Sequence, residues 1–127
     1  MTKRSARKAR QVRQDQVFAW GRETFGDLSM CVWERARRFL EEAIELAQAA
    51  GVSPNEAAAV MDRAYRRPPG LIHTELGQAG LTLEMFAASV GMNAEEKTAA
   101  EFERVLSIPA DEWRARLAKK VAEGIAQ

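Results

Sequence analysis

Apolar residues recur three and four positions apart along most of this chain, and no run of alternating β-branched residues interrupts the pattern. This spacing gathers apolar side chains on one face of an α-helix, whereas a half-buried strand would show a period of two. The clearest stripe begins after residue 30, ends at Gly51 and consists of Val32, Ala36, Phe39, Ala43, Leu46 and Ala50. We therefore expect an all-α protein, an antiparallel bundle of four to six helices that oligomerisation completes.

Prolines, glycines and capping residues divide this pattern into short helices. The segment Ser53-Pro54-Asn55-Glu56 combines a capping serine, a proline in the first turn and a glutamate three residues on, which predicts a helix start. Pro68-Pro69-Gly70 predicts a break. A further helix is expected from about Ile72 to Val90, another after Asn93, and a last one after Pro109.

The length of 127 residues and the hydrophobic content of 46% fit one folded domain, which we place at residues 15–127. Residues 1–14 are expected to form a flexible basic segment, with a phosphate-attracting arm as the alternative. The cations that precede the first acid, Asp15, are Lys3, Arg4, Arg7, Lys8, Arg10 and Arg13.

Charge and cysteine content narrow the partners that we expect. The 19 basic and 18 acidic side chains nearly cancel, so the whole molecule has no strong field that would draw it onto nucleic acid. The basic segment before Asp15 has no apolar stretch, so it predicts neither a secretory signal nor a membrane span. The single cysteine, Cys31, agrees with a reducing compartment, and we expect a cytoplasmic protein without membrane or nucleic-acid partners.

Carboxylates at helical spacing are the candidate functional residues. Glu42 and Glu45 lie three apart beside the apolar stripe, and Glu75 is followed at the same spacing by the amide Gln78. Side chains three apart share a helix face, and two such faces packed together could hold a divalent cation. Glutamates beside an apolar stripe are also typical of the solvated flank of a helix, and spacing alone leaves both interpretations open.

The order of these residues resembles the MazG-like, all-α nucleoside triphosphate pyrophosphohydrolases, in particular their small, often phage-associated members. That family carries Glu-Glu-x-x-Glu on one helix and Glu-x-x-Asp on a later helix. The similarity covers roughly residues 17–106. The two motif matches are Glu41-Glu42-Ala43-Ile44-Glu45, within Arg38 to Leu46, and Glu75-Leu76-Gly77-Gln78. Three further segments also fit the family, namely the spacer with Arg67-Pro68 and Gly70, the Gly91-Met92-Asn93 turn and the helix from Glu101 to Arg104.

The resemblance implies a Mg²⁺-dependent hydrolase, with Mn²⁺ as a possible substitute, that cleaves between the α- and β-phosphates of a nucleotide. It also implies a homodimer or a homotetramer. It assigns four residues to the metal, namely Glu42, Glu45, Glu75 and Gln78. It assigns Glu41 and Glu42 to catalysis, with a surface position as the alternative for Glu41. The candidates for the substrate phosphates are Arg38, Lys97 and Arg104, and the candidate for base stacking is Trp20. For each cation a surface or intrahelical ion pair is the alternative, and for Trp20 a place in the core.

The sequence departs from the family pattern at Gln78, where the family has an aspartate. An amide supplies a neutral oxygen without the charge that holds the metal. The alternative function is therefore a catalytically weakened nucleotide-binding or regulatory module with the same fold. A third hypothesis is a small DNA-binding protein with a helix-turn-helix around Gly51 to Pro54, but the following helix carries too few cations to favour it.

Overall fold

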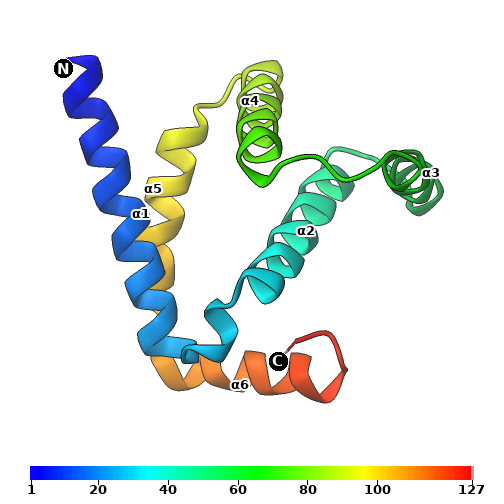
Figure 1. The fold of residues 1–127 in the computed structure, drawn as a ribbon. Helices are drawn as coiled ribbons and strands as arrows, with labels where there is room; N and C mark the ends of the chain where they lie inside the picture. Colours follow the sequence, from blue (N-terminus) through cyan, green and yellow to red (C-terminus); the bar gives the residue numbers. More distant parts are fainter. Residues whose placement is uncertain (127) are drawn as a thin grey trace. The chain divides into compact units, whose positions relative to one another are not determined.

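A computed structural model describes residues 1–126, and within that range the chain forms six α-helices, one short 3₁₀-helix and no strand (Figure 1). The elements are α1 (Lys3–Phe25), η1 (Leu28–Met30), α2 (Val32–Ala49), α3 (Pro54–Tyr65), α4 (Ile72–Ser89), α5 (Ala94–Leu106) and α6 (Ala110–Ala122). The prediction of an all-α protein is confirmed. The antiparallel bundle and its completion by oligomerisation stay predictions, and Gln127, the end of the predicted domain, lies outside the described residues.

The local signals at helix ends act as the sequence predicts. Ser53 Oγ accepts the backbone N–H of Glu56 at 3.2 Å, and the Glu56 carboxylate accepts the backbone N–H of Ser53 at 3.0 Å. This reciprocal capping box starts α3. Gly51 and Gly91 follow α2 and α4 with φ angles of 97° and 69°, a left-handed conformation in which glycine avoids the penalty of a Cβ atom.

The basic N-terminal segment is helical in the structure. Helix α1 begins at Lys3, and Thr2 caps it by accepting the backbone N–H of Ser5 at 3.2 Å. Residues 3–14, expected to precede the first helix, are therefore its first half, while their flexibility in solution stays a prediction. No helix among the described residues is both long and apolar enough to cross a bilayer.

The chain divides into two compact units, and the division falls within α2. Unit 1 comprises residues 1–41 together with the segment that begins at Val105, and unit 2 comprises Glu42–Arg104. Unit 1 therefore contains α1, η1, the first part of α2 and α6. Unit 2 contains the end of α2, all of α3 and α4, and most of α5. The single domain predicted for residues 15–127 stays a prediction, and each unit is described by itself.

Helix α6 packs against the C-terminal end of α1 in unit 1 (Figure 1), and aromatic side chains join the two helices. The ring of Trp20 meets Phe25 at 5.6 Å and Trp113 at 5.7 Å between centroids, both edge to face, and Phe25 lies 6.4 Å from Trp113. Edge-to-face pairs are favourable beyond the area that they bury. The Arg114 guanidinium adds a 3.1 Å hydrogen bond to the carbonyl oxygen of Thr24.

The turn between α1 and α2 packs closely on α1. Gly21 is buried, and a Cβ atom at that position would lie 2.9 Å from Met30 Sδ, so only glycine admits this approach without a shift. Arg35 Nε donates a 2.7 Å hydrogen bond to the carbonyl oxygen of Ser29, which is itself buried. These contacts hold η1 against α1 and tie the first turn of α2 to η1.

A fully buried carboxylate lies in the first turn of α2. Glu34 has no exposed surface, and its Oε1 lies 3.0 Å from Arg38 Nε and its Oε2 3.9 Å from Arg37 Nη1. Neither carboxylate oxygen has hydrogen-bond geometry to another described residue, so charge attraction is the main compensation for burial. Sequence analysis did not single out Glu34.

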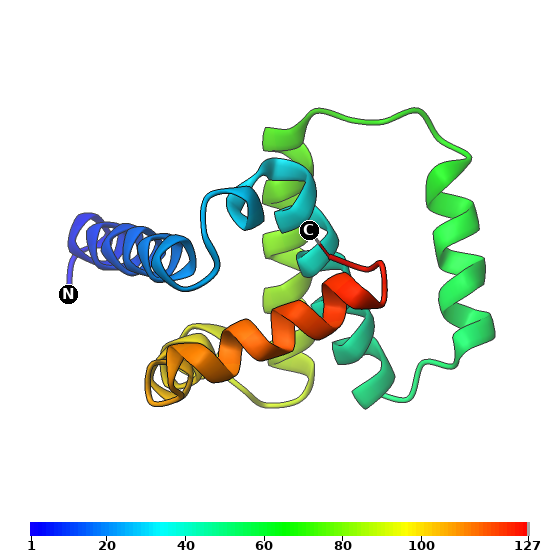
Figure 2. The same cartoon turned by 90° about the horizontal axis from the view of Figure 1, so that it is seen from below.

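The apolar faces in unit 2 are mostly exposed. Ala87 is its one buried apolar residue among those described, and no residue of α3 is buried. Helices α3 and α4 lie apart in both views (Figures 1 and 2). The stripe predicted to be buried on α2 is exposed as well, with Phe39 at 62% and Leu46 at 40%. That prediction is wrong for the single chain, because the units to which these residues belong do not cover the stripe.

We predict that Glu34→Ala lowers the free energy of unfolding of unit 1 by about 2–3 kcal/mol, since it removes the buried partner of Arg38, which keeps only its pairing with Glu41. Glu112→Ala is the matched control, because Glu112 pairs with Arg116 at the same i,i+4 spacing but is 54% exposed. The control should cost about 1 kcal/mol or less. Urea denaturation followed by circular dichroism measures both. Equal losses for the two variants would contradict the role assigned to the buried pair.

Candidate functional site

Glu42 and Glu45 lie on the part of α2 that belongs to unit 2, and both are exposed. Because they are three residues apart on one helix, their Cβ atoms are roughly 5–6 Å apart on the same face. Ile44 and Leu46, which flank Glu45 in the sequence, are 50% and 40% exposed. The predicted acidic pair is therefore presented at a surface that also carries apolar side chains.

Glu75 lies in the first turn of α4, and its backbone N–H donates to the carbonyl oxygen of Leu71 at 3.0 Å. A carboxylate in a first helical turn interacts favourably with the positive end of the helix dipole. The Glu75 side chain folds back over Gly70, where any Cβ atom would collide with Oε1. Gly70 therefore does more than break the preceding helix, because it makes room for this carboxylate.

Gln78 lies one turn further along α4 and is exposed. Its backbone carbonyl oxygen accepts a 2.9 Å hydrogen bond from Thr82 Oγ1. Because Gln78 follows Glu75 by three residues on α4, the two side chains lie on the same face of the helix, as predicted.

The described residues of one chain include no group of three or more histidine, cysteine, aspartate or glutamate side chains close enough to hold a metal ion. Glu42, Glu45 and Glu75 are thus not brought together within residues 1–126. The residues as arranged in one chain do not fit the Mg²⁺ or Mn²⁺ site that the resemblance implies. The metal cofactor stays a prediction.

Glu41 and Arg38 are engaged in unit 1 instead. Lys120 Nζ on α6 donates to the two Glu41 oxygens at 3.1 and 3.4 Å. Arg38 also pairs with Glu41 and donates from Nη2 to the carbonyl oxygen of Ile125, in addition to its contact with Glu34. These contacts favour the structural alternative over phosphate binding for Arg38.

The same contacts lower the pKa of Glu41. The hydrogen bond from Lys120 is the largest cause, the charges of Lys120 and Arg38 act in the same direction, and partial burial opposes them. A lowered pKa keeps the Glu41 carboxylate ionised, so it is less suited to accept a proton at neutral pH. The structure does not favour the catalytic role predicted for Glu41.

The remaining predicted site residues fall into different surroundings. Arg104 forms a 2.6 Å ion pair with Glu101 on the exposed side of α5, and this pairing raises the pKa of Arg104 and lowers that of Glu101. Lys97 is exposed on the same helix. Trp20 is packed against Phe25 and Trp113, which favours the core alternative over base stacking.

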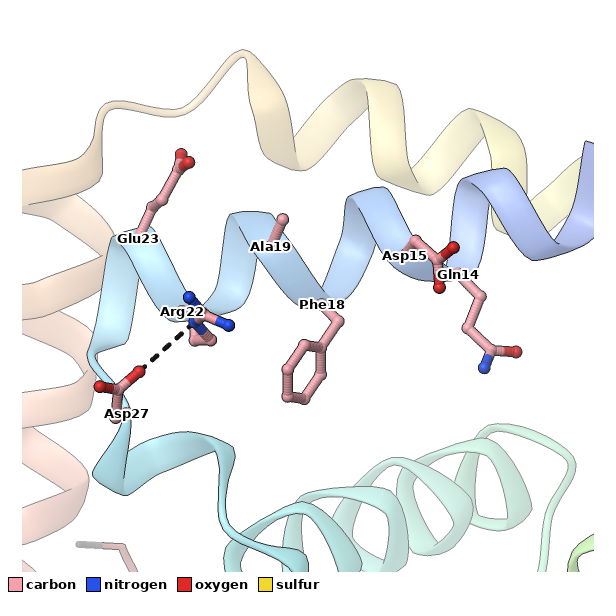
Figure 3. Close-up of a pocket in the computed structure, with 7 residues that line it drawn as sticks. All are labelled: Gln14, Asp15, Phe18, Ala19, Arg22, Glu23 and Asp27. Carbon is pink, nitrogen blue, oxygen red and sulfur yellow. Dashed lines mark ion pairs between the residues drawn. The ribbon is translucent and has the colours of Figure 1, made fainter.

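A surface groove of about 600 Å³ runs along α1 in unit 1 (Figure 3) and contains none of the predicted site residues. Its lining residues are Gln14, Asp15, Phe18, Ala19, Arg22, Glu23 and Asp27. The ion pair in it, Arg22 Nε to Asp27 Oδ1 at 3.4 Å, has side chains that are 60% and 94% exposed. A pair so well solvated contributes little electrostatic energy, so the groove offers no convergent polar site.

We predict that Glu41→Gln lowers stability by about 1 kcal/mol at neutral pH, because it removes a charged acceptor from Lys120. Since the folded-state pKa of Glu41 lies below the ordinary value near ~4.3, the stabilisation is complete above that value and is lost as the pH falls through the lowered pKa. Thermal unfolding of both proteins between pH 7 and pH 3 measures this. Lys120→Met should weaken the pH dependence of stability that Glu41 causes. A stability difference between the unmodified protein and Glu41→Gln that stays constant down to pH 3 would contradict the role given to the Glu41 and Lys120 pair.

Comparisons with protein-family models, with curated proteins and with solved structures found no match to this chain.

Proposed function

We propose that this protein is a nucleotide pyrophosphohydrolase that requires Mg²⁺ and converts a nucleoside triphosphate, a deoxynucleoside triphosphate or a related nucleotide to monophosphate and pyrophosphate. The proposal rests on the resemblance of the Glu41 to Glu45 and Glu75 to Gln78 segments to the MazG-like pattern. Mg²⁺ would neutralise charge on the phosphate oxygens, a requirement of phosphoryl transfer.

One structural observation supports the proposal more than any other. The predicted site glutamates lie in two kinds of surroundings. Glu41 pairs with Lys120 and Arg38, whereas the others are exposed on helix surfaces. Glu45 and Glu75 are exposed and form no ion pair with another described residue. An unpaired carboxylate on a helix surface is available to bind a cation.

The second candidate function is a nucleotide-binding or regulatory module without effective catalysis. Gln78 favours it, because this exposed amide provides no negative charge where the family has an aspartate. Both functions predict that the protein binds nucleotides, and only the first predicts pyrophosphate as a product.

We propose further that the functional form is a homodimer or a homotetramer. The exposed apolar side chains of α2, α3 and α4 support this, since their burial against another copy would be favourable. A light-scattering mass equal to one chain would contradict it.

We predict that the purified protein releases pyrophosphate from at least one member of a panel of nucleoside and deoxynucleoside triphosphates when Mg²⁺ or Mn²⁺ is present. Loss of a metal-binding carboxylate removes several kcal/mol of charge stabilisation, so Glu45→Gln or Glu75→Gln should lower kcat/KM by roughly 100-fold or more. A coupled assay for pyrophosphate measures both effects.

Glu84→Gln is the matched control for Glu75→Gln. Glu84 is nine residues further along α4, which places it on the opposite face of that helix at a distance of about 13.5 Å along the axis. The Glu84→Gln variant should release pyrophosphate at a rate close to that of the unmodified protein. If no nucleotide yields pyrophosphate while titration still detects nucleotide binding, the binding module replaces the enzyme as the better proposal.

A further inference from the structure

The first half of α1 is a strongly basic surface of unit 1, and we propose that it binds double-stranded DNA through the phosphate backbone. Residues 1–14 carry six basic side chains and no acidic one, whereas residues 15–127 carry 13 basic and 18 acidic side chains. The near-zero net charge of the whole chain therefore conceals a segment of charge +6 joined to a remainder of charge −5. The inference does not depend on the proposed function, because none of these six cations belongs to the candidate site.

Five of these cations lie on one face of α1. An α-helix turns by about 100° per residue, which places the five side chains within an arc of about 160°. They also extend over about 10.5 Å along the helix axis. The opposite face carries Ser5, Ala9 and Val12. We call the five cations the basic face, and they are Lys3, Arg4, Arg7, Lys8 and Arg10.

The basic face is accessible to a partner. All five side chains are exposed, and none of them forms an ion pair with another described residue. The ring and hydrogen-bond contacts of α1 with α6 come from Trp20, Thr24 and Phe25, near the other end of the helix. The N-terminal end of α1, coloured blue, extends away from α6 (Figures 1 and 2).

The basic face carries an internal repulsion that bound anions would relieve. Like charges three or four residues apart destabilise a helix, and Arg4 with Lys8 and Arg7 with Arg10 are such pairs. The first turn of α1 also contains Lys3 and Arg4 but no acidic residue, although the positive end of a helix dipole favours acidic residues. A row of phosphates supplies the negative charge that this half of the helix lacks.

Shape and composition favour a DNA duplex over other polyanions. The major groove of B-form DNA is about 12 Å wide and admits an α-helix, and the duplex carries one phosphate charge per ~1.7 Å of its axis. The major groove of duplex RNA is deep and too narrow for side chains to read. A helix that lies on a membrane has large apolar residues opposite its cations, whereas that face of α1 has only Ser5, Ala9 and Val12.

We predict that the protein binds a DNA duplex of arbitrary sequence at about 50 mM KCl, which the fluorescence anisotropy of labelled DNA measures. Each phosphate contact contributes about −0.9 to the slope of log K against log salt, so five contacts give a slope of about −4.5. Raising KCl from about 50 to about 150 mM should therefore weaken binding roughly 100-fold. Absence of binding at about 50 mM KCl overturns the inference.

A triple variant with Arg4→Gln, Arg7→Gln and Lys8→Gln tests whether the basic face carries the binding. Glutamine is a good helix former, so α1 should stay helical, which circular dichroism checks. The loss of three phosphate contacts should reduce the slope to about −1.8 and weaken binding at about 50 mM KCl by roughly 100-fold or more. Unchanged affinity and slope would overturn the inference.

The matched control combines Arg63→Gln, Arg66→Gln and Arg67→Gln. These exposed cations lie at the end of α3 and just after it, and their replacement lowers the net charge by the same amount. The control should keep the slope of the unmodified protein. Equal losses in the two triple variants would show that total charge, and not the basic face, governs binding. A loss confined to the control would transfer DNA binding to α3, and either result overturns the inference.

Hydrogen exchange of the unmodified protein locates the contact without any substitution. Backbone amides of residues 3–12 should exchange more slowly when DNA is present, because phosphates relieve the repulsion along the basic face. Slower exchange elsewhere with no change in this segment would contradict the assignment. Duplex RNA and vesicles of pure phosphatidylserine are titrated alongside, and tighter binding to either of them than to DNA overturns duplex DNA as the partner.

Discussion

The rest of the structure depends on one constraint, namely that an amphipathic helix is stable only where its apolar face is covered. Helix formation by itself provides little free energy, and most helical stability in proteins comes from packing of the apolar face. Unit 1 meets this requirement in part through the aromatic contacts of Trp20, Phe25 and Trp113. In unit 2 most large apolar side chains are exposed in a single chain.

The glutamates of this chain show how environment assigns different roles to one residue type. Glu34 is buried against Arg38 of its own helix, α2, and Glu41 ties that helix to Lys120 on α6. Glu45 and Glu75 remain at the surface. Burial with a counter-charge makes a carboxylate structural, whereas exposure beside apolar side chains leaves it free to act at an interface.

Local signals were predictable from the sequence, and tertiary ones were not. The capping box at Ser53 and the turn at Gly91 depend on neighbouring residues alone, so the ends of α2 to α5 were predicted closely, whereas the start of α1 was not. Of the candidate site, the helical placement of Glu45 and Glu75 was predictable. The burial of Glu34 was not, although its place in a first helical turn, four residues before an arginine, was a weak sign. The pairing of Glu41 with Lys120 joins residues far apart in the chain, which no spacing rule can detect.

The distribution of aromatic residues between the two units gives each a separate optical signal. All three tryptophans, Trp20, Trp33 and Trp113, belong to unit 1, and the only tyrosine, Tyr65, belongs to unit 2. Indole fluorescence therefore reports directly on the surroundings of α1, α2 and α6, and phenol absorbance on the end of α3. Because Tyr65 is 82% exposed in a single chain, its absorbance would shift when another molecule covers α3. Assembly and the unfolding of unit 1 can thus be followed in one sample without any added label.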